Sequence, residues 1–380
     1  MVIDPDLLDG PLAETLAALP LVDHHVHGAL RTDVDRTEFE SLITEAPRAT
    51  PGFTSFDSQV GFAIRRWCAP LLDLAPHAGA DDYWRRRVEL GNGEVTERLL
   101  RASGIGSYLI DTGHRSDDVL DPAGHAAVSG AQALEIVRLE ALAERLLARC
   151  GSGRGFVSDF PDLLRAETAN AVGVKSILAY RYGFDVPAER PPEAEVVARA
   201  DVALGDGSAA RIADPVLLRY LLWAAVDRGL PIQIHCGYGD PDLDLHRANP
   251  SLLSGWLRLV EPTGVPVMLL HCYPYQREAG FLAQVFGNVY FDVGEGLNYV
   301  GAQSVQLVAE SLELAPFHKQ LFSSDAWGPA ELHLLGSWLW RRAICTVVGR
   351  WVTRGDWSLP DAERVIALIG SGNAERVYRL

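Results

Sequence analysis

The sequence feature that most constrains the fold is a recurrence of short apolar runs, each followed by a stretch with the pattern of a helix. Buried parallel strands are almost continuously apolar because both faces of their sheet are covered, and strand–helix alternation is typical of parallel α/β proteins. The eight runs predict a (β/α)8 TIM barrel in which residues 1–380 form a single unit. They are residues 21–27, 105–112, 133–140, 172–180, 231–237, 265–272, 288–294 and 319–325.

One segment does not follow this alternation. Residues 30–103, between the first and second runs, are too long for a simple strand-to-helix connection. They contain two helix-like stretches, residues 59–74 and 81–90. Because the segment leaves the C-terminal end of a barrel strand, where active sites of this fold lie, we predict a helical cap over the barrel mouth.

Charge and cysteine usage exclude several classes of partner. The 50 acidic residues outnumber the 34 basic ones, which gives a formal net charge of −16. Binding to nucleic acid needs clustered Lys and Arg, so we expect no nucleic-acid partner. No apolar stretch approaches the roughly 18 residues of a membrane span, and the acidic N-terminus lacks the pattern of a signal peptide. The five scattered cysteines are typical of reduced thiols, so we expect a cytoplasmic protein with no membrane partner.

Histidines and an aspartate occupy the ends of several predicted strands. His25 and His27 lie two residues apart in the first run, so strand periodicity sends both imidazoles to the same side. Such a pair suits a transition metal, although an isolated pair is more often hydrogen-bonded inside a core. The interpretation changes because His235, His271 and Asp325 end the fifth, sixth and eighth runs. Together these side chains predict a metal site at the C-terminal rim of the barrel.

The same periodicity makes predictions for neighbouring residues. Asp23 is expected on the side of the first strand that carries the paired histidines, where it would support the ligands from behind, and His24 is expected to face the outer helices. Three further histidines have no strand setting, so we expect them at the surface or in loops; they are His77, His125 and His318.

The chain resembles the amidohydrolase superfamily in the order of these residues along the strands. They are Asp23-x-His25-x-His27, then His235, His271 and Asp325. The resemblance covers nearly the whole chain apart from the predicted cap. Four stretches are similar to one branch in particular, the amidohydrolase domain that is joined to glutamine-synthetase-like domains in certain fungal and plant proteins. These stretches are residues 172–181, 271–294, 321–326 and 372–378.

The resemblance implies a divalent metal cofactor, with zinc as the first expectation and manganese or iron as alternatives. The implied ligands are His25, His27, His235, His271 and Asp325. In two-metal members a carboxylated lysine on the fourth strand bridges both ions, and Lys175 lies in the fourth run. Left unmodified, this lysine would instead bind a substrate carboxylate or pair with the aspartate. We expect one tightly bound ion per chain, with a second ion as the open alternative.

Three further side chains are candidate substrate ligands. Tyr180 and Arg181 are expected beyond Lys175 on the fourth strand, and the planar guanidinium is suited to bind a carboxylate. A salt bridge from Arg181 to a neighbouring loop fits the sequence equally well. Glu140 ends the third run and either faces the substrate or holds Arg138 or a metal ligand.

The function implied by the resemblance is hydrolysis of an amide C–N bond by metal-activated water. Asp325 would accept the proton of the water and return it to the leaving amine, while His271 would help to polarise the carbonyl. We expect a small, carboxylate-bearing substrate, for example a γ-glutamyl amide, and a homo-oligomeric enzyme.

The principal alternative is a single-metal decarboxylase of an aromatic or muconate-like acid. Such an enzyme favours arginines and aromatic residues at its mouth, and the predicted cap contains Arg65, Arg66, Trp67, Trp84 and Arg85. A non-catalytic scaffold is the third reading, and it is the least favoured because an unfilled cluster of buried polar groups is costly to keep.

Overall fold

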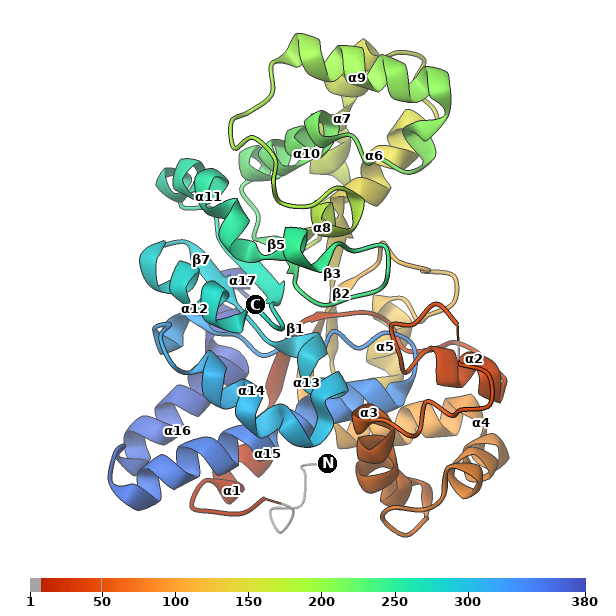
Figure 1. Cartoon of the computed structure of the whole chain (residues 1–380), viewed down its shortest axis with the longest axis vertical. Helices are drawn as coiled ribbons and strands as arrows, with labels where there is room; N and C mark the ends of the chain where they lie inside the picture. The colour runs from red at the N-terminus through yellow and green to blue at the C-terminus, as the bar shows by residue number, and fades with distance from the viewer. Residues whose placement is uncertain (1–7, 49) are drawn as a thin grey trace.

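Seven parallel strands form the centre of the fold. The computed structural model describes residues 8–48 and 50–380. The strands of its sheet follow one another in sequence order, and helices surround them (Figure 1). Each of the first seven apolar runs contains one strand, so the predicted parallel α/β class is confirmed. The strands are β1 (Leu21–Val26), β2 (Ile105–Asp111), β3 (Gln132–Arg138), β4 (Gly173–Ser176), β5 (Ile232–Cys236), β6 (Val267–His271) and β7 (Val289–Phe291).

The eighth apolar run is not a regular strand, although residues 320–326 connect the two edges of the sheet. Leu321 N donates to the carbonyl oxygen of Phe291 in β7 at 3.0 Å, and Asp325 N donates to the carbonyl oxygen of His25 in β1 at 3.1 Å. The backbone of Asp325 is left-handed, with a φ of 51°, which ends the extended conformation at that point. The fold is therefore TIM-barrel-like with seven strands, and an eighth regular strand is not confirmed.

Side chains from distant strands meet inside the curl of this sheet. Val22 of β1, Leu109 of β2, Ile136 of β3 and Leu270 of β6 belong to one buried cluster together with Tyr378 near the C-terminus. Since β1 and β6 are not neighbours, these side chains can meet only if the sheet curls around them. This cluster is the apolar floor on which the polar ends of the strands rest.

Helix ends follow ordinary capping rules. In α10 the Asp214 carboxylate accepts hydrogen bonds from the backbone N–H groups of Val216 and Leu217, and Gly229 ends the helix with a φ of 76°. The α-helices are α1 (Ala13–Ala18), α2 (Arg36–Ser41), α3 (Gln59–Ala63), α4 (Ala80–Ala102), α5 (Pro122–Ser129), α6 (Leu139–Leu147), α7 (Gly153–Glu167), α8 (Leu178–Arg181), α9 (Glu193–Asp206), α10 (Pro215–Arg228), α11 (Ser254–Val260), α12 (Gln276–Val285), α13 (Gly294–Val300), α14 (Ser304–Ser311), α15 (Ala330–Arg354), α16 (Leu359–Ala367) and α17 (Asn373–Tyr378). Short 3-10 or π-helical turns are η2 (Ile64–Cys68), η3 (Ala69–Leu72), η4 (Ser208–Ala210), η5 (Leu245–Ala248), η6 (Pro250–Leu253), η7 (Glu261–Thr263), η8 (Gly301–Gln303), η9 (Phe317–Lys319) and η10 (Leu368–Gly372).

The segment between β1 and β2 does not form one helical cap. Helix α4 packs against α5 and α15, as expected of the helix that connects the first two strands of a barrel. Helix α3 and the turn η2 pack against α13 and α15. Among the residues of this segment that the structure describes, only side chains within residues 41–45 line the central cavity. A cap over all of residues 30–103 is therefore not confirmed, because most of the apolar side chains there join the cluster around α15.

The longest helix, α15, is largely buried even though it contains charged residues. Its Arg341 donates from Nη2 to the carbonyl oxygens of Leu19 and Gly104, at 2.8 and 3.0 Å. Such hydrogen bonds compensate the cost of taking a guanidinium out of water. Within the described ranges no helix, α15 included, is both long enough and apolar enough to cross a membrane.

Candidate metal centre

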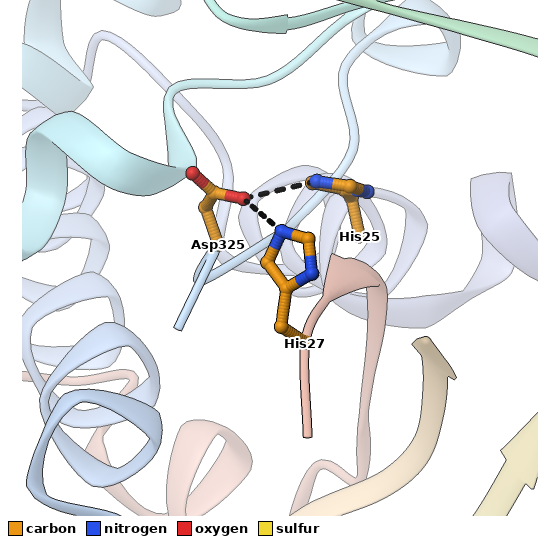
Figure 2. Close-up of side chains that lie close together, drawn as sticks. All are labelled: His25, His27 and Asp325. Carbon is orange, nitrogen blue, oxygen red and sulfur yellow. Dashed lines mark ion pairs between the residues drawn. The ribbon is translucent and has the colours of Figure 1, made fainter. Parts of the chain in front are cut away.

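Three of the predicted ligands converge at the C-terminal end of β1. Figure 2 shows the imidazoles of His25 and His27 directed at the carboxylate of Asp325. Asp325 Oδ1 lies 2.9 Å from His25 Nε2 and 3.7 Å from His27 Nε2. One ligand atom from each of the three residues lies within 4.8 Å of the others, a spacing that a single ion can bridge. These three residues are called the metal centre below.

A bulge in β1 lets two successive histidines, His24 and His25, face the interior of the barrel. The register of β1 against β2 shifts between Asp23 and Val26. Asp23 points to the other side, where its carboxylate accepts hydrogen bonds from the backbone N and the hydroxyl of Ser324 at 3.0 and 2.5 Å. The predictions that Asp23 shares a side with His25 and that His24 faces outward are therefore wrong, because the bulge interrupts the alternation.

Hydrogen bonds at the far nitrogens fix the tautomers of both first-strand ligands. Gln233 Nε2 donates to the carbonyl oxygen of His24 at 2.6 Å, so its Oε1 accepts the hydrogen of His25 Nδ1 at 2.8 Å. His27 Nδ1 lies 3.0 Å from the carbonyl oxygen of Asp111, which can only accept. Both rings therefore carry their hydrogen on Nδ1 and present the Nε2 lone pair to the carboxylate. This arrangement, with the second nitrogen donating to a carbonyl group, is common in metal-binding histidines.

Gln233 belongs to a buried hydrogen-bond network beneath the metal centre. Its Nε2 also donates to the Tyr378 hydroxyl at 2.8 Å, and that hydroxyl lies 3.0 Å from His24 Nδ1. His24 Nε2 is 2.9 Å from a carboxylate oxygen of Asp292, whose other oxygen accepts from the backbone N of His271 at 3.0 Å. The network connects β1, β5, β6 and α17, and it holds two predicted ligands in position.

The other two predicted ligands form a second group with Glu295, a residue that the sequence analysis did not select. Ligand atoms of His235, His271 and Glu295 lie within 4.8 Å of one another, and all three residues are buried. His235 Nε2 donates to the carbonyl oxygen of Tyr238 at 2.9 Å, which leaves Nδ1 with the lone pair. The backbone of His271 is left-handed, with a φ of 64°. This conformation turns its ring inward even though the preceding Leu270 also faces inward.

The buried atoms of the centre fit a cation. Asp325 Oδ1 and both ring nitrogens of His271 are buried and have no hydrogen-bond partner among the described residues. His271 Nε2 is 3.5 Å from Asp325 Oδ2, too far for a strong hydrogen bond. Asp325 Oδ1 also faces the His25 lone pair, so two electron-rich atoms oppose each other at 2.9 Å. Unpaired buried acceptors are costly, and imidazoles with a carboxylate suit zinc, manganese or iron.

Burial sets the protonation states at this centre. Burial raises the pKa of Asp325 to about 6, although His27 and Lys175 attract its charged form. Burial also lowers the pKa of His27 to about 3 and that of the other three predicted histidine ligands well below the usual value. The imidazoles are therefore neutral near pH 7, as metal coordination requires.

Lys175 lies against the metal centre but pairs with Asp111 rather than with Asp325. Its Nζ is 2.9 Å from His25 Nε2 and 3.8 Å from Asp111 Oδ2. Burial lowers the pKa of Lys175, an effect that Asp111 partly opposes. Arg138 donates from Nε and Nη2 to the same Asp111 oxygen at 3.1 and 2.6 Å. Burial would raise the pKa of Asp111, but Arg138 and the other nearby cationic groups outweigh it and hold that pKa well below its usual range.

The three predicted substrate ligands have different positions. Tyr180 lines the central cavity, and its ring centroid lies 4.4 Å from that of His235. Arg181 also lines it, but it belongs to α8 rather than to a strand, and its Nη1 donates to Glu144 at 2.6 Å. The carboxylate of Glu140 accepts from the hydroxyl of the last β4 residue and from the next backbone N–H, at 2.7 and 3.0 Å. It lies outside the residues that line the cavity, because it holds the start of α6 against β4.

A cavity of about 390 Å³ opens at the metal centre. Its walls carry basic and acidic side chains that sequence analysis did not select; they are Glu45, His114, Arg115, Arg138, Arg211 and Glu295. Asp240 and Asp242, in the loop after β5, line it as well. Arg138 continues the interior parity of β3, which could have identified it, whereas nothing in the sequence pattern marks Glu45.

Two expectations about residues away from the cavity are wrong. His125 is fully buried in α5, where its ring centroid lies 4.5 Å from that of Tyr108, whereas His77 and His318 are exposed as expected. The arginines and tryptophans that favoured a decarboxylase do not line the described cavity; they are Arg65, Arg66, Trp67, Trp84 and Arg85. Trp67, for example, packs on Trp338 instead.

Solved structures resemble this fold over its whole length. A protein from Lactobacillus casei is 27% identical with a TM-score of 0.85, and the match covers 98% of both chains. That protein has been assigned provisionally as a metal-dependent hydrolase. Uronate isomerase from Thermotoga maritima is 13% identical with a TM-score of 0.67 and complete coverage of both chains. A uronate isomerase from Bacillus halodurans is 15% identical with a TM-score of 0.66, covering 96% of this chain and 94% of the other. The two isomerases show the shared fold alone.

Sequence comparisons define the family. Protein fluG from Emericella nidulans is 28% identical over 401 residues, which cover 95% of this chain and 46% of fluG. The chain thus spans about half the length of this curated relative. The family model described as amidohydrolase matches residues 116–380, well over half of the chain. This match includes the predicted ligands His235, His271 and Asp325, and because it covers well over half of the chain, the chain belongs to the amidohydrolase family.

Proposed function

We propose that this protein is a metal-dependent hydrolase that cleaves the amide C–N bond of a small, carboxylate-bearing substrate such as a γ-glutamyl amide. The observation that carries the proposal is the buried, unpartnered Oδ1 of Asp325, which faces the lone pairs of two neutral imidazoles. Family membership supports hydrolysis, while the C–N bond and the substrate are our extension. We further propose that the barrel acts as one catalytic unit and that residues 41–45 are the part of the inserted segment that covers its mouth.

His25, His27 and Asp325 would hold the ion, and His271 lies at its edge through Asp325 Oδ2. A bound divalent cation supplies Lewis acidity, which lowers the pKa of water from 15.7 to roughly 7 and polarises a carbonyl group. Zinc suits this donor set, and manganese and iron accept the same ligands. We propose one ion per chain.

Asp325 is suited to move the proton. Burial raises the pKa of its carboxylate to about 6, and a bound cation would lower that pKa again, so the carboxylate is ionised at pH 7 and can act as a base. It can accept the proton of the attacking water and return it to the amine as the C–N bond breaks. His271, whose two ring nitrogens have no partner in the described structure, can position the substrate carbonyl beside it.

The substrate carboxylate is assigned to Arg138 rather than to Arg181. Glu144 already occupies Nη1 of Arg181, so this arginine has an internal partner. Arg138 lines the cavity and uses Nε and Nη2 on Asp111, and Nη1 is the nitrogen that this carboxylate does not engage. Lys175 adds a second positive charge nearby.

A product assay tests this function. Metal-loaded protein is given γ-glutamyl amides in one series and aromatic acids in another, with release of amine, ammonia and CO₂ measured. We expect amine or ammonia from the amides, lost in Asp325→Asn and retained in the exposed control Asp361→Asn. Release of CO₂ from the acids, with intact amides, would overturn the proposal in favour of decarboxylation.

A further inference from the structure

One wall of the cavity carries acidic groups that the proposed hydrolysis does not use. Glu45 follows α2, Asp240 follows β5 and Glu295 lies in the first turn of α13, and all three line the cavity. We call these three residues the acidic wall. The Tyr299 hydroxyl donates to Glu45 Oε1 at 2.7 Å, which fixes this carboxylate at the cavity.

Two buried oxygen atoms beside this wall have no donor. Glu295 is 5% exposed and Asn298 is 2% exposed, and both line the cavity. In the described structure neither Glu295 Oε2 nor Asn298 Oδ1 has a hydrogen-bond partner. The Asn298 amide is oriented by its Nδ2, which donates to the carbonyl oxygen of Ser324 at 3.1 Å, so its oxygen is the atom left without a partner. Asn298 Oδ1 can only accept hydrogen bonds, and Glu295 Oε2 accepts when its carboxyl group is ionised.

The chemical complement of this wall is a small group with several donors and a positive charge. Buried carboxylates without a donor or a counter-charge are costly, so a ligand that supplies both is strongly favoured over one that supplies neither. An ammonium group has three N–H donors in a compact volume. Tyr299, which also lines the cavity, adds an aromatic ring of the kind that attracts cations.

We propose that the substrate carries a free ammonium group, which Glu295 binds together with Glu45 and Asn298. The substrate class is then an amino-acid amide with an unblocked amine, rather than a simple acyl amide of a dicarboxylic acid. The identity of the cleaved bond rests on the proposed function, whereas recognition of the amine rests on the acidic wall alone.

A second metal ion is the competing occupant, because Glu295 also lies within 4.8 Å of His235 and His271. An ion held by that group would satisfy Glu295 but would leave Asn298 Oδ1 without a donor, since Asn298 does not belong to the group. The ammonium group accounts for all of these acceptors together, and it is therefore the occupant that the cavity supports.

Binding of a matched ligand pair tests the inference. L-Glutamate and glutarate differ only in the α-ammonium group, and their dissociation constants are measured by calorimetry on zinc-loaded protein. We expect wild type to bind L-glutamate at least tenfold more tightly than glutarate. The substitutions Glu295→Gln and Glu45→Gln should bring the two affinities within about twofold of each other. The control Glu310→Gln, on α14 and outside the cavity lining, should keep the preference.

The outcomes separate this inference from the proposed function. Equal affinities in wild type, or a preference that survives both substitutions, would overturn the ammonium site. Loss of one metal equivalent in Glu295→Gln with an unchanged ligand preference would likewise overturn it in favour of a second ion. The anilides of γ-glutamate and of glutarate provide the kinetic counterpart. If neither anilide is cleaved while L-glutamate is still preferred, the ammonium site stands and only the proposed hydrolysis fails.

Discussion

Replacing Gln233 by leucine should weaken metal binding without touching a ligand. Gln233 Oε1 accepts the Nδ1 hydrogen of His25, and this hydrogen bond directs the opposite nitrogen to the metal. Loss of such a supporting partner typically costs 10- to 100-fold in metal affinity, which corresponds to about 1.4–2.7 kcal/mol. The substitution also leaves the carbonyl oxygen of His24 and the hydroxyl of Tyr378 without this donor, at roughly 1–3 kcal/mol of folding stability each.

The assay is competition between the protein and a fluorescent chelator for zinc, with urea unfolding measured in parallel to separate affinity from stability. Gln233→Glu keeps an acceptor for His25, so its zinc affinity should stay within about tenfold of wild type. Gln276→Leu is the matched control, because Gln276 is also buried but donates to Glu310, and neither residue lines the cavity. Folded Gln233→Leu with unchanged zinc affinity would refute the reasoning that the network fixes the ligand tautomer.

Three further predictions follow from the same contacts. Asp325→Asn should lower turnover by at least about a hundredfold while the circular dichroism spectrum and the unfolding midpoint change little, since the amide keeps the shape but not the base; near-normal turnover would remove the assigned proton acceptor. Arg181→Ala should change KM equally for a carboxylate substrate and its methyl ester, because the guanidinium is paired with Glu144; a selective effect on the acid would return Arg181 to the binding site. Burial lowers the pKa of His125 from 6.5 to about 4, so its neutral form contributes stability above pH 6.5 that is lost as the pH falls toward 4. His125 contributes about 3 kcal/mol to the loss of stability measured by urea unfolding between pH 7 and pH 4, in addition to the other buried histidines, and His125→Gln should reduce the loss by about that amount; an unchanged pH dependence would contradict the assignment.

Strand periodicity and strand order were sufficient to predict that His25, His27 and Asp325 lie close together, whereas the predicted partners His235 and His271 form a second group with Glu295. His25 and His27 were selected by their spacing, and Asp325 because it ends the last apolar run. The three side chains lie together because residues at the C-terminal ends of parallel strands meet at one edge of the sheet, and this does not depend on how the helices pack. The same reasoning could have identified Arg138, since its position in β3 is two residues after Ile136, whose side chain faces the interior.

The errors arise where the backbone departs from regular alternation. A bulge reverses the sides of Asp23 and His24, and a left-handed residue turns His271 inward. A continuous apolar run does not distinguish a strand from a short helix, so the end of β4 at Ser176 and the position of Arg181 in α8 could not be read from it. Side chains such as Glu45 reach the cavity through long-range packing, for which one sequence contains no local signal.

The central claim is that one divalent ion is held by His25, His27 and Asp325. Anomalous diffraction from crystals grown with zinc, recorded on both sides of the zinc absorption edge, tests it most directly. We predict one peak at about 2.0–2.2 Å from His25 Nε2, His27 Nε2 and an oxygen of Asp325. A fully active crystal preparation with no anomalous peak among these three atoms, or with its zinc bound only elsewhere, would contradict the account.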